Sequence, residues 1–216
     1  MNTFSVGRRF AGWTFMALAV TLALAFAAAG LLGYEAASIE EGPLERAQEV
    51  VLALSIFLFV GAAIYQRGAG RMASFGMVLL CIVFFLRELE LPVSGPVTAY
   101  LHTDTFRLHE TIALLALGLP YLALRWRLIP QFWAYAVSLR GWPFVLSAAL
   151  VGLGAAAEAM VPHFPVWSMG VFFEETFETM AYVVLACLAV HVMMAAFQQY
   201  QMQAAGTMPQ PVTRLR

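Results

Sequence analysis

The sequence predicts an all-α, polytopic integral membrane protein, a six-helix transmembrane bundle with both termini in the cytoplasm. Three observations lead to this prediction. Of the 216 residues, 62% are hydrophobic and 12% are charged, and mean hydropathy is +0.78. Soluble domains are nearer half apolar and a quarter charged. Several apolar runs are long enough to cross a bilayer, and the arginines gather in the loops on one side of these runs.

A spanning helix needs about 20 predominantly apolar residues. Runs of this kind, separated by short polar or Gly- and Pro-containing connections, cover residues 11–33, 44–65, 72–91, 108–126 and 143–161, and a last run ends near Tyr200. Residues 1–200 are therefore expected to form one six-span transmembrane domain. Residues 201–216 are polar and contain prolines, so we expect a short, disordered cytoplasmic tail.

The first apolar run follows Arg8 and Arg9, as the apolar part of a signal peptide would. Because the run is longer than a typical signal core, we expect a retained anchor, with a cleaved signal peptide as the alternative. Residues 128–141 are too short to span and are expected to lie along the cytoplasmic interface, with Trp133 and Tyr135 at headgroup depth. Residues 91–107 form a connection on the outer side.

Every basic residue is an arginine, since the chain contains no lysine. This absence excludes a retinal Schiff base, a pyridoxal-phosphate aldimine and a phosphate-loop lysine. Three arginines lie on one side of the predicted spans, Arg46, Arg87 and Arg107; the remaining nine lie on the other side, Arg8, Arg9, Arg67, Arg71, Arg125, Arg127, Arg140, Arg214 and Arg216. The positive-inside rule places the second set in the cytoplasm, and we expect a multi-pass protein of a bacterial inner membrane.

The acidic residues are segregated in the opposite sense. All 13 fall on the outer side or in the outer halves of the spans: Glu35, Glu40, Glu41, Glu45, Glu49, Glu88, Glu90, Asp104, Glu110, Glu158, Glu174, Glu175 and Glu178. Carboxylates contribute little to membrane orientation, so the positive-inside rule does not explain this placement.

Several of these carboxylates lie inside the apolar runs, where an ionisable group costs about 2–3 kcal/mol or more and usually faces the bundle interior. Glu41, Glu45 and Glu49 are four residues apart, as are Glu174 and Glu178, which places each set along one helix side. We therefore expect several carboxylates to share an inward site, with Arg87 as a tethered counter-charge. The alternative is that the acids cap helix N-termini or reach water.

Carboxylates with an imidazole suit Zn, Mn or Fe, and carboxylates alone suit Ca or Mg. The expected cofactor is therefore a divalent metal ion of open identity. The candidate ligands are Glu49, Glu88, His109, Glu110, Glu158, Glu175 and Glu178.

Three function classes remain open. The first is a cation-handling membrane protein that binds a metal ion, a proton or an organic cation for transport, sensing or delivery. The second is a membrane-embedded enzyme acting on a lipid-like substrate at the outer leaflet, with Glu110 or Glu178 as general base and His109 as acid or metal ligand. The third is a structural or assembly subunit that docks a basic membrane or periplasmic protein through its acidic rim. The formal net charge of −1 gives no indication of nucleic-acid binding.

Overall fold

The computed structural model describes residues 2–39, 42–89 and 94–205, which form helices and no strands. The all-α class is therefore confirmed. Glu40, Glu41, Glu90 and the tail beyond residue 205 lie outside the described residues. The α-helices are α1 (Arg8–Leu32), α2 (Tyr34–Ser38), α3 (Pro43–Tyr65), α4 (Gly68–Glu88), α5 (Pro96–Leu101), α6 (Asp104–Leu124), α7 (Ile129–Ala136), α8 (Trp142–Met160) and α9 (Trp167–Ala204). Short 3-10 turns are η1 (Asn2–Phe4), η2 (Trp126–Leu128), η3 (Leu139–Gly141) and η4 (Val161–His163).

Within the described residues, five helical segments are long and apolar enough to cross a membrane, as expected of a multi-pass membrane protein: Arg8–Leu32, Tyr34–Tyr65, Gly68–Glu88, Leu139–His163 and Trp167–Ala204. The remaining expected span, over residues 108–126, is not among these five. Here α6 ends at Leu124, and the chain bends by 73° before it continues as Trp126–Ala136. A sixth span is reached only if this bent pair is counted as one. The location of the termini stays a prediction.

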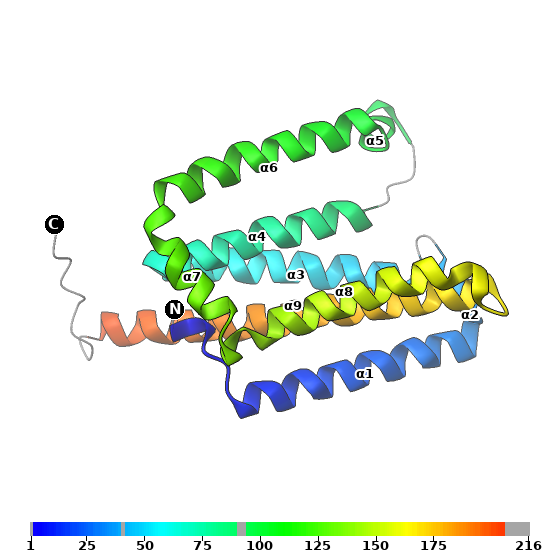
Figure 1. Cartoon of the computed structure of the whole chain (residues 1–216), viewed down its shortest axis with the longest axis horizontal. Helices are drawn as coiled ribbons and strands as arrows, with labels where there is room; N and C mark the ends of the chain where they lie inside the picture. The colour runs from blue at the N-terminus through cyan, green and yellow to red at the C-terminus, as the bar shows by residue number, and fades with distance from the viewer. Residues whose placement is uncertain (1, 40–41, 90–93, 206–216) are drawn as a thin grey trace.

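Helix α9 lies at the centre of the bundle. It packs against α1, α2, α3 and α8, and α3 packs in turn against α4. Figure 1 shows α6 standing apart from the other long helices, with α4 as its nearest long neighbour. Helix α9 also extends to Ala204, so the residues from 201 to 204, expected to be disordered, are helical.

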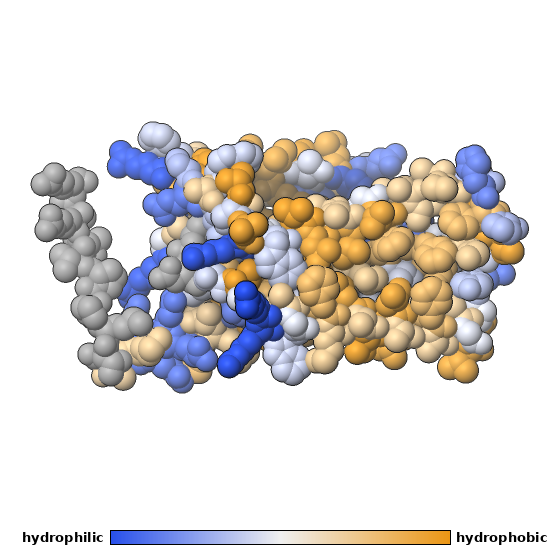
Figure 2. Space-filling model, turned by 60° about the horizontal axis from the view of Figure 1, so that its bottom comes forward, coloured by the Kyte–Doolittle hydropathy of each residue, from blue (hydrophilic) through white to orange (hydrophobic). Residues whose placement is uncertain are grey.

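The two ends of the bundle carry opposite charge. The chain passes up and down, so that α1 begins and α9 ends at the same end in Figure 1. We call this the basic end, because it carries Arg8, Arg9, Arg67, Arg71, Arg125, Arg127 and Arg140. The other end, where α2 and the α8–α9 connection lie, is called the acidic end. Between the two ends, the face that α1 covers is a broad apolar band (Figure 2).

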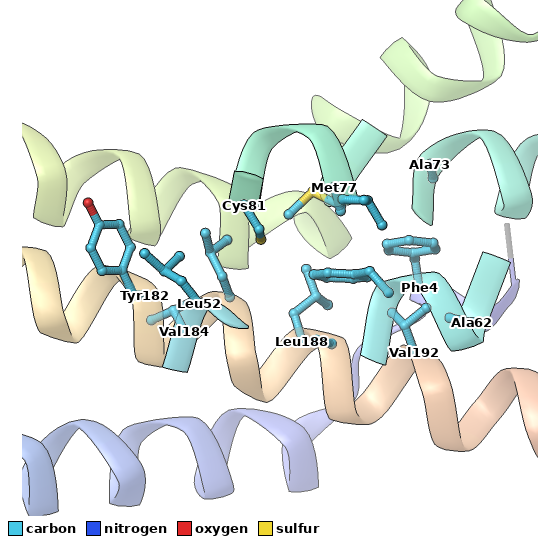
Figure 3. Packing of buried hydrophobic residues seen from close by; sticks show 14 of the residues in the cluster. Phe4, Leu52, Ala62, Ala73, Met77, Cys81, Tyr182, Val184, Leu188 and Val192 are labelled. Atoms are coloured by element: carbon cyan, nitrogen blue, oxygen red, sulfur yellow. The ribbon is translucent and has the colours of Figure 1, made fainter. Parts of the chain in front are cut away.

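The core lies between α3, α4 and α9, with a contribution from η1. Its fully buried side chains include Leu52 and Phe59 of α3, Cys81 of α4 and Leu188 of α9, and part of this cluster is seen in Figure 3. Because lipid tails are as apolar as these side chains, close packing rather than exclusion of water holds such helices together.

The segment before α1 closes the basic end of this core. Phe4 is buried in the core cluster, and its carbonyl oxygen accepts a hydrogen bond from the Tyr135 hydroxyl at 2.8 Å. Gln66 donates to the Thr3 hydroxyl at 2.8 Å and accepts from the Ser74 hydroxyl at 2.7 Å. Tyr135, expected at headgroup depth, is buried against other residues of this end of the bundle; its depth in the membrane stays a prediction.

This closure predicts that Phe4→Ala destabilises the protein. The substitution leaves a cavity in a packed core, at a cost of about 3 kcal/mol. The matched control is Phe57→Ala in α3, because the Phe57 side chain is 76% exposed on the apolar surface. Thermal unfolding in mild detergent should show a lower midpoint for Phe4→Ala alone. Equal midpoints for both variants would mean that the segment does not belong to the core.

Candidate functional site

An arginine, two carboxylates and a tyrosine join α4 to α9 near the acidic end. Arg87 and Glu88 occupy the last turn of α4. Glu178 and Tyr182 lie one turn apart on α9, so both side chains face the same neighbour. Figure 3 shows the Tyr182 ring beside the apolar core with its hydroxyl pointing away from it.

Hydrogen bonds connect all four side chains. Arg87 Nε donates to Glu88 Oε1 at 2.8 Å, and Arg87 Nη2 lies 2.7 Å from the same oxygen. Arg87 Nη2 also donates to Glu178 Oε2 and, at 3.0 Å, to the Tyr182 hydroxyl. That hydroxyl donates in turn to Glu88 Oε1 at 2.8 Å. We call these residues the Arg87 network.

The Arg87 network is buried unevenly. The side chains of Glu88 and Glu178 are each 9% exposed, whereas that of Arg87 is 45% exposed. A carboxylate inside a membrane protein is tolerated when it is paired and fully hydrogen-bonded, and here each has the guanidinium as a partner. The expected role of Arg87 as a tethered counter-charge agrees with this geometry. Its exposed part remains available to a molecule outside the network.

A second polar contact joins α3 to α9. Gln48 is fully buried, and its amide nitrogen donates to Glu175 Oε2 at 2.7 Å and lies 3.1 Å from the Thr179 hydroxyl. The Gln48 side-chain oxygen has no hydrogen-bond partner among the described residues. Glu175 is thus held by an amide rather than by an arginine, on a different helix pair from the Arg87 network.

Two further acids lie close to the Arg87 network. Glu174 interacts electrostatically with both Glu158 of α8 and Glu178. Gly154 allows the approach of α8, because a Cβ added there would lie 3.1 Å from Glu178 Cγ. Neither Glu158 nor Glu174 forms an ion pair with an arginine within 4 Å in the described part of the chain, although Arg87 interacts electrostatically with Glu174 over a longer distance. This group of acids carries more negative charge than Arg87 compensates.

A hollow of about 650 Å³ lies between α4 and α6 beside the Arg87 network. Its polar lining consists of Arg87, Arg107, Glu110 and Thr111, and the remainder is apolar. Arg107 Nη1 donates to the Leu86 carbonyl oxygen at 2.9 Å and lies 3.5 Å from Glu110 Oε2. We call this the α4–α6 hollow.

A second, apolar hollow of about 380 Å³ lies between α4, α6 and α7, closer to the basic end. Helices α4 and α6 approach each other at the wall of this second hollow, where a Cβ on Gly118 would lie 3.5 Å from Leu79 Cδ1. The space beside α4 thus changes along the helix from apolar to charged.

The expected ligand set is divided among several places. Glu88 and Glu178 belong to the Arg87 network, Glu175 contacts Gln48, and Glu110 lines the α4–α6 hollow. Glu158 is exposed on α8, Glu49 is half-buried on α3, and His109 Nδ1 lies 2.5 Å from the Tyr100 hydroxyl. No group of three or more His, Cys, Asp or Glu in the described ranges could hold a metal ion. A metal centre therefore has no structural support.

Sequence reasoning did not identify Tyr182, Gln48 or Thr179 as part of the polar contacts. The available signal was spacing: Tyr182 follows Glu178 by four residues, and Thr179 follows Glu175 by four. Gln48 precedes Glu49, and the structure places the amide, not the carboxylate, against α9.

The chain matches no known family model, no curated protein and no solved structure. Its function therefore has to be inferred from its own residues.

The Arg87 network predicts that Glu178→Gln lowers stability while Glu158→Gln does not. Removing one partner of a buried ion pair costs about 3–5 kcal/mol, which lowers an unfolding midpoint by about 6–20 °C in a chain of this size. Glu158 is the control because it is an exposed glutamate of the same region. Thermal unfolding of both variants in mild detergent measures the difference. Similar midpoints would show that the pair does not hold α4 to α9.

Proposed function

We propose that this membrane protein binds a lipid-like amphiphile with an oxyanion head in the α4–α6 hollow. The observation that carries the proposal is the change in lining along α4, from apolar side chains to two half-exposed arginines. A head group would contact Arg87 and Arg107, and an apolar tail would lie along α4 and α6. The volume of about 650 Å³ is in the usual range for small-molecule sites, about 300–1,000 Å³.

Unused donors support an oxyanion head. In the Arg87 network, Nε and Nη2 have acceptors, whereas Arg87 Nη1 has none among the described residues. The same holds for Arg107 Nη2 and Nε. Guanidinium groups bind phosphate or carboxylate through two parallel hydrogen bonds. Because Glu88 and Glu178 are buried and already paired, and the Glu110 side chain is 10% exposed and lies beside Arg107, the accessible charges are the two guanidiniums.

The position of the hollow favours a ligand that arrives through the membrane. Its rim includes Val83 of α4 and Leu115 of α6, both apolar and exposed, so it opens between apolar side chains of these two helices. A site of this kind admits molecules dissolved in the leaflet. The proposed ligand belongs to the lipid-like class that was expected as the substrate of a membrane-embedded enzyme.

The proposal predicts that dodecyl phosphate stabilises the purified chain in neutral detergent, whereas dodecanol does not. At about 100 times its dissociation constant, a ligand adds about 2.7 kcal/mol, or about 5–10 °C in midpoint. Leu115→Trp, which fills the hollow, and Arg107→Gln should both reduce the shift. Leu117→Trp is the control, because Leu117 is an exposed α6 leucine outside the lining. An undiminished shift in Leu115→Trp would contradict the proposal.

A second candidate function is binding of an organic cation or a proton at the acids around Gly154. It rests on the position of Glu158 and Glu174 beside Glu178, where the acids outnumber the one nearby arginine, Arg87. In the same assay this candidate predicts stabilisation by dodecyltrimethylammonium, lost in Glu158→Gln. The control is Glu35→Gln, since Glu35 is an exposed acid of α2. No stabilisation by the cationic amphiphile, or equal stabilisation of both variants, would exclude an organic cation here.

A further inference from the structure

A third large hollow lies between α1 and α9 on the opposite half of the bundle. Its volume is about 790 Å³. Apolar side chains form most of its wall, among them Trp13 and Val20 of α1 and Val183 and Val190 of α9. Arg9 and His191 also line it. Nothing in the proposed function uses this space, which we call the α1–α9 hollow.

The length of the α1–α9 hollow matches one leaflet. From Arg9 to Val20 the lining follows α1 for eleven residues, which is about 16 Å at 1.5 Å per residue. From Met194 to Val183 it follows α9 over the same number of residues. Half of a hydrocarbon core of about 30 Å has nearly this depth. An acyl chain that enters at the basic end would therefore stay in contact with apolar wall along its length.

The charge at the mouth of the hollow is positive. Neither Arg8 nor Arg9 has a hydrogen-bond or ion-pair partner in the described part of the chain. By contrast, Arg71 donates to the carbonyl oxygens of Ala63 and Gln66 at the end of α3. The described carboxylates lie toward the acidic end. Basic residues beside a membrane attract anionic lipids at about 1 kcal/mol each, and no nearby acid opposes that attraction here.

Two side chains near Arg9 suit the depth at which a lipid head group would lie. Trp13, 67% exposed, lies one turn beyond Arg9, and tryptophan prefers the headgroup region of a bilayer. His191 contacts the Phe10 ring, with ring centroids 5.1 Å apart, and its Nε2 lies 3.2 Å from the Ser5 carbonyl oxygen. These contacts fix the wall of the hollow beneath Arg9, where the head group would end and the acyl chain begin.

We propose that the α1–α9 hollow binds an acidic glycerophospholipid from the leaflet at the basic end. The phosphate pairs with Arg9, supported by Arg8, and one acyl chain fills the apolar wall between α1 and α9. The lipid thereby fastens α1 to α9 on the side of the bundle that the Arg87 network does not reach.

The test is a lipid titration of the full-length, delipidated protein followed by native mass spectrometry. Leu115→Trp serves as the parent, so that the α4–α6 hollow does not contribute and the two proposals can fail separately. The probes are phosphatidylglycerol and phosphatidylcholine with identical acyl chains. Phosphatidylglycerol should bind the parent at least about tenfold more tightly, which is about 1.4 kcal/mol.

Two variants and two controls locate this binding. Arg9→Gln should weaken phosphatidylglycerol binding about fivefold, the factor expected for one basic residue at the surface. Arg67→Gln should not, although Arg67 is an equally exposed arginine of the basic end. Val190→Trp, which fills the hollow, should abolish the preference. Val50→Trp, on the exposed side of α3, should retain it.

Three results would each overturn the proposal. The first is equal affinity for phosphatidylglycerol and phosphatidylcholine in the parent. The second is an equal effect of Arg9→Gln and Arg67→Gln, which would indicate general attraction to a basic surface. The third is an unchanged preference in Val190→Trp. Unfolding midpoints of the variants show in parallel that each remains folded during the titration.

Discussion

The pairing of Arg87 with Glu88 and Glu178 is the constraint on which the arrangement of this bundle depends. Charges in the apolar part of a membrane protein are stable only with partners, and here Glu178 and Tyr182 of α9 partner the charged pair at the end of α4. Their hydrogen bonds fix how α4 and α9 are rotated and how far each helix is displaced along the other. Tyr182 extends this control to the core, because its ring is buried among apolar side chains while its hydroxyl completes the network. The packing of α3 between α4 and α9 follows from the same fixed geometry.

Charge segregation gives the two halves of the molecule different chemistry. At the acidic end, carboxylates outnumber the described arginines, and the Arg87 network leaves one guanidinium face open toward α6. At the basic end, arginines stand without nearby acids, while Phe4 and Tyr135 close the core behind them. The hollows described above are lined by side chains of neighbouring helices, α1 with α9 and α4 with α6. In both binding proposals, an arginine at one end of the hollow pairs with the ligand's head group, and the apolar wall contacts its tail.

Much of the fold could be predicted from composition and periodicity, and much of the site could not. Apolar runs determine where α1, α3, α4, α8 and α9 lie, since hydropathy alone requires these stretches to be helical in lipid. The 73° bend after Leu124 falls where the expected apolar run ends, beside Arg125 and Arg127, but its angle depends on local backbone geometry that hydropathy does not determine. Convergence of Glu88 with Glu178 depends on helix rotation, which spacing on single helices does not determine. Likewise, tyrosine is a residue type that suits the membrane interface, and only the fold shows that the Phe4 carbonyl oxygen lies within reach of the Tyr135 hydroxyl.

The central position of α9 has a consequence for biosynthesis. A chain inserted from its N-terminus delivers α4, with Arg87 and Glu88, long before α9 leaves the ribosome. During that interval Arg87 has its neighbour Glu88 but lacks Glu178 and Tyr182. The helices that will surround α9 have no central helix to pack against. Insertion of the last helix therefore both fills the middle of the bundle and completes its ion pairs. A chain truncated before α9 would leave α4 with incompletely paired charge in the membrane, the kind of species that quality-control proteases recognise and remove.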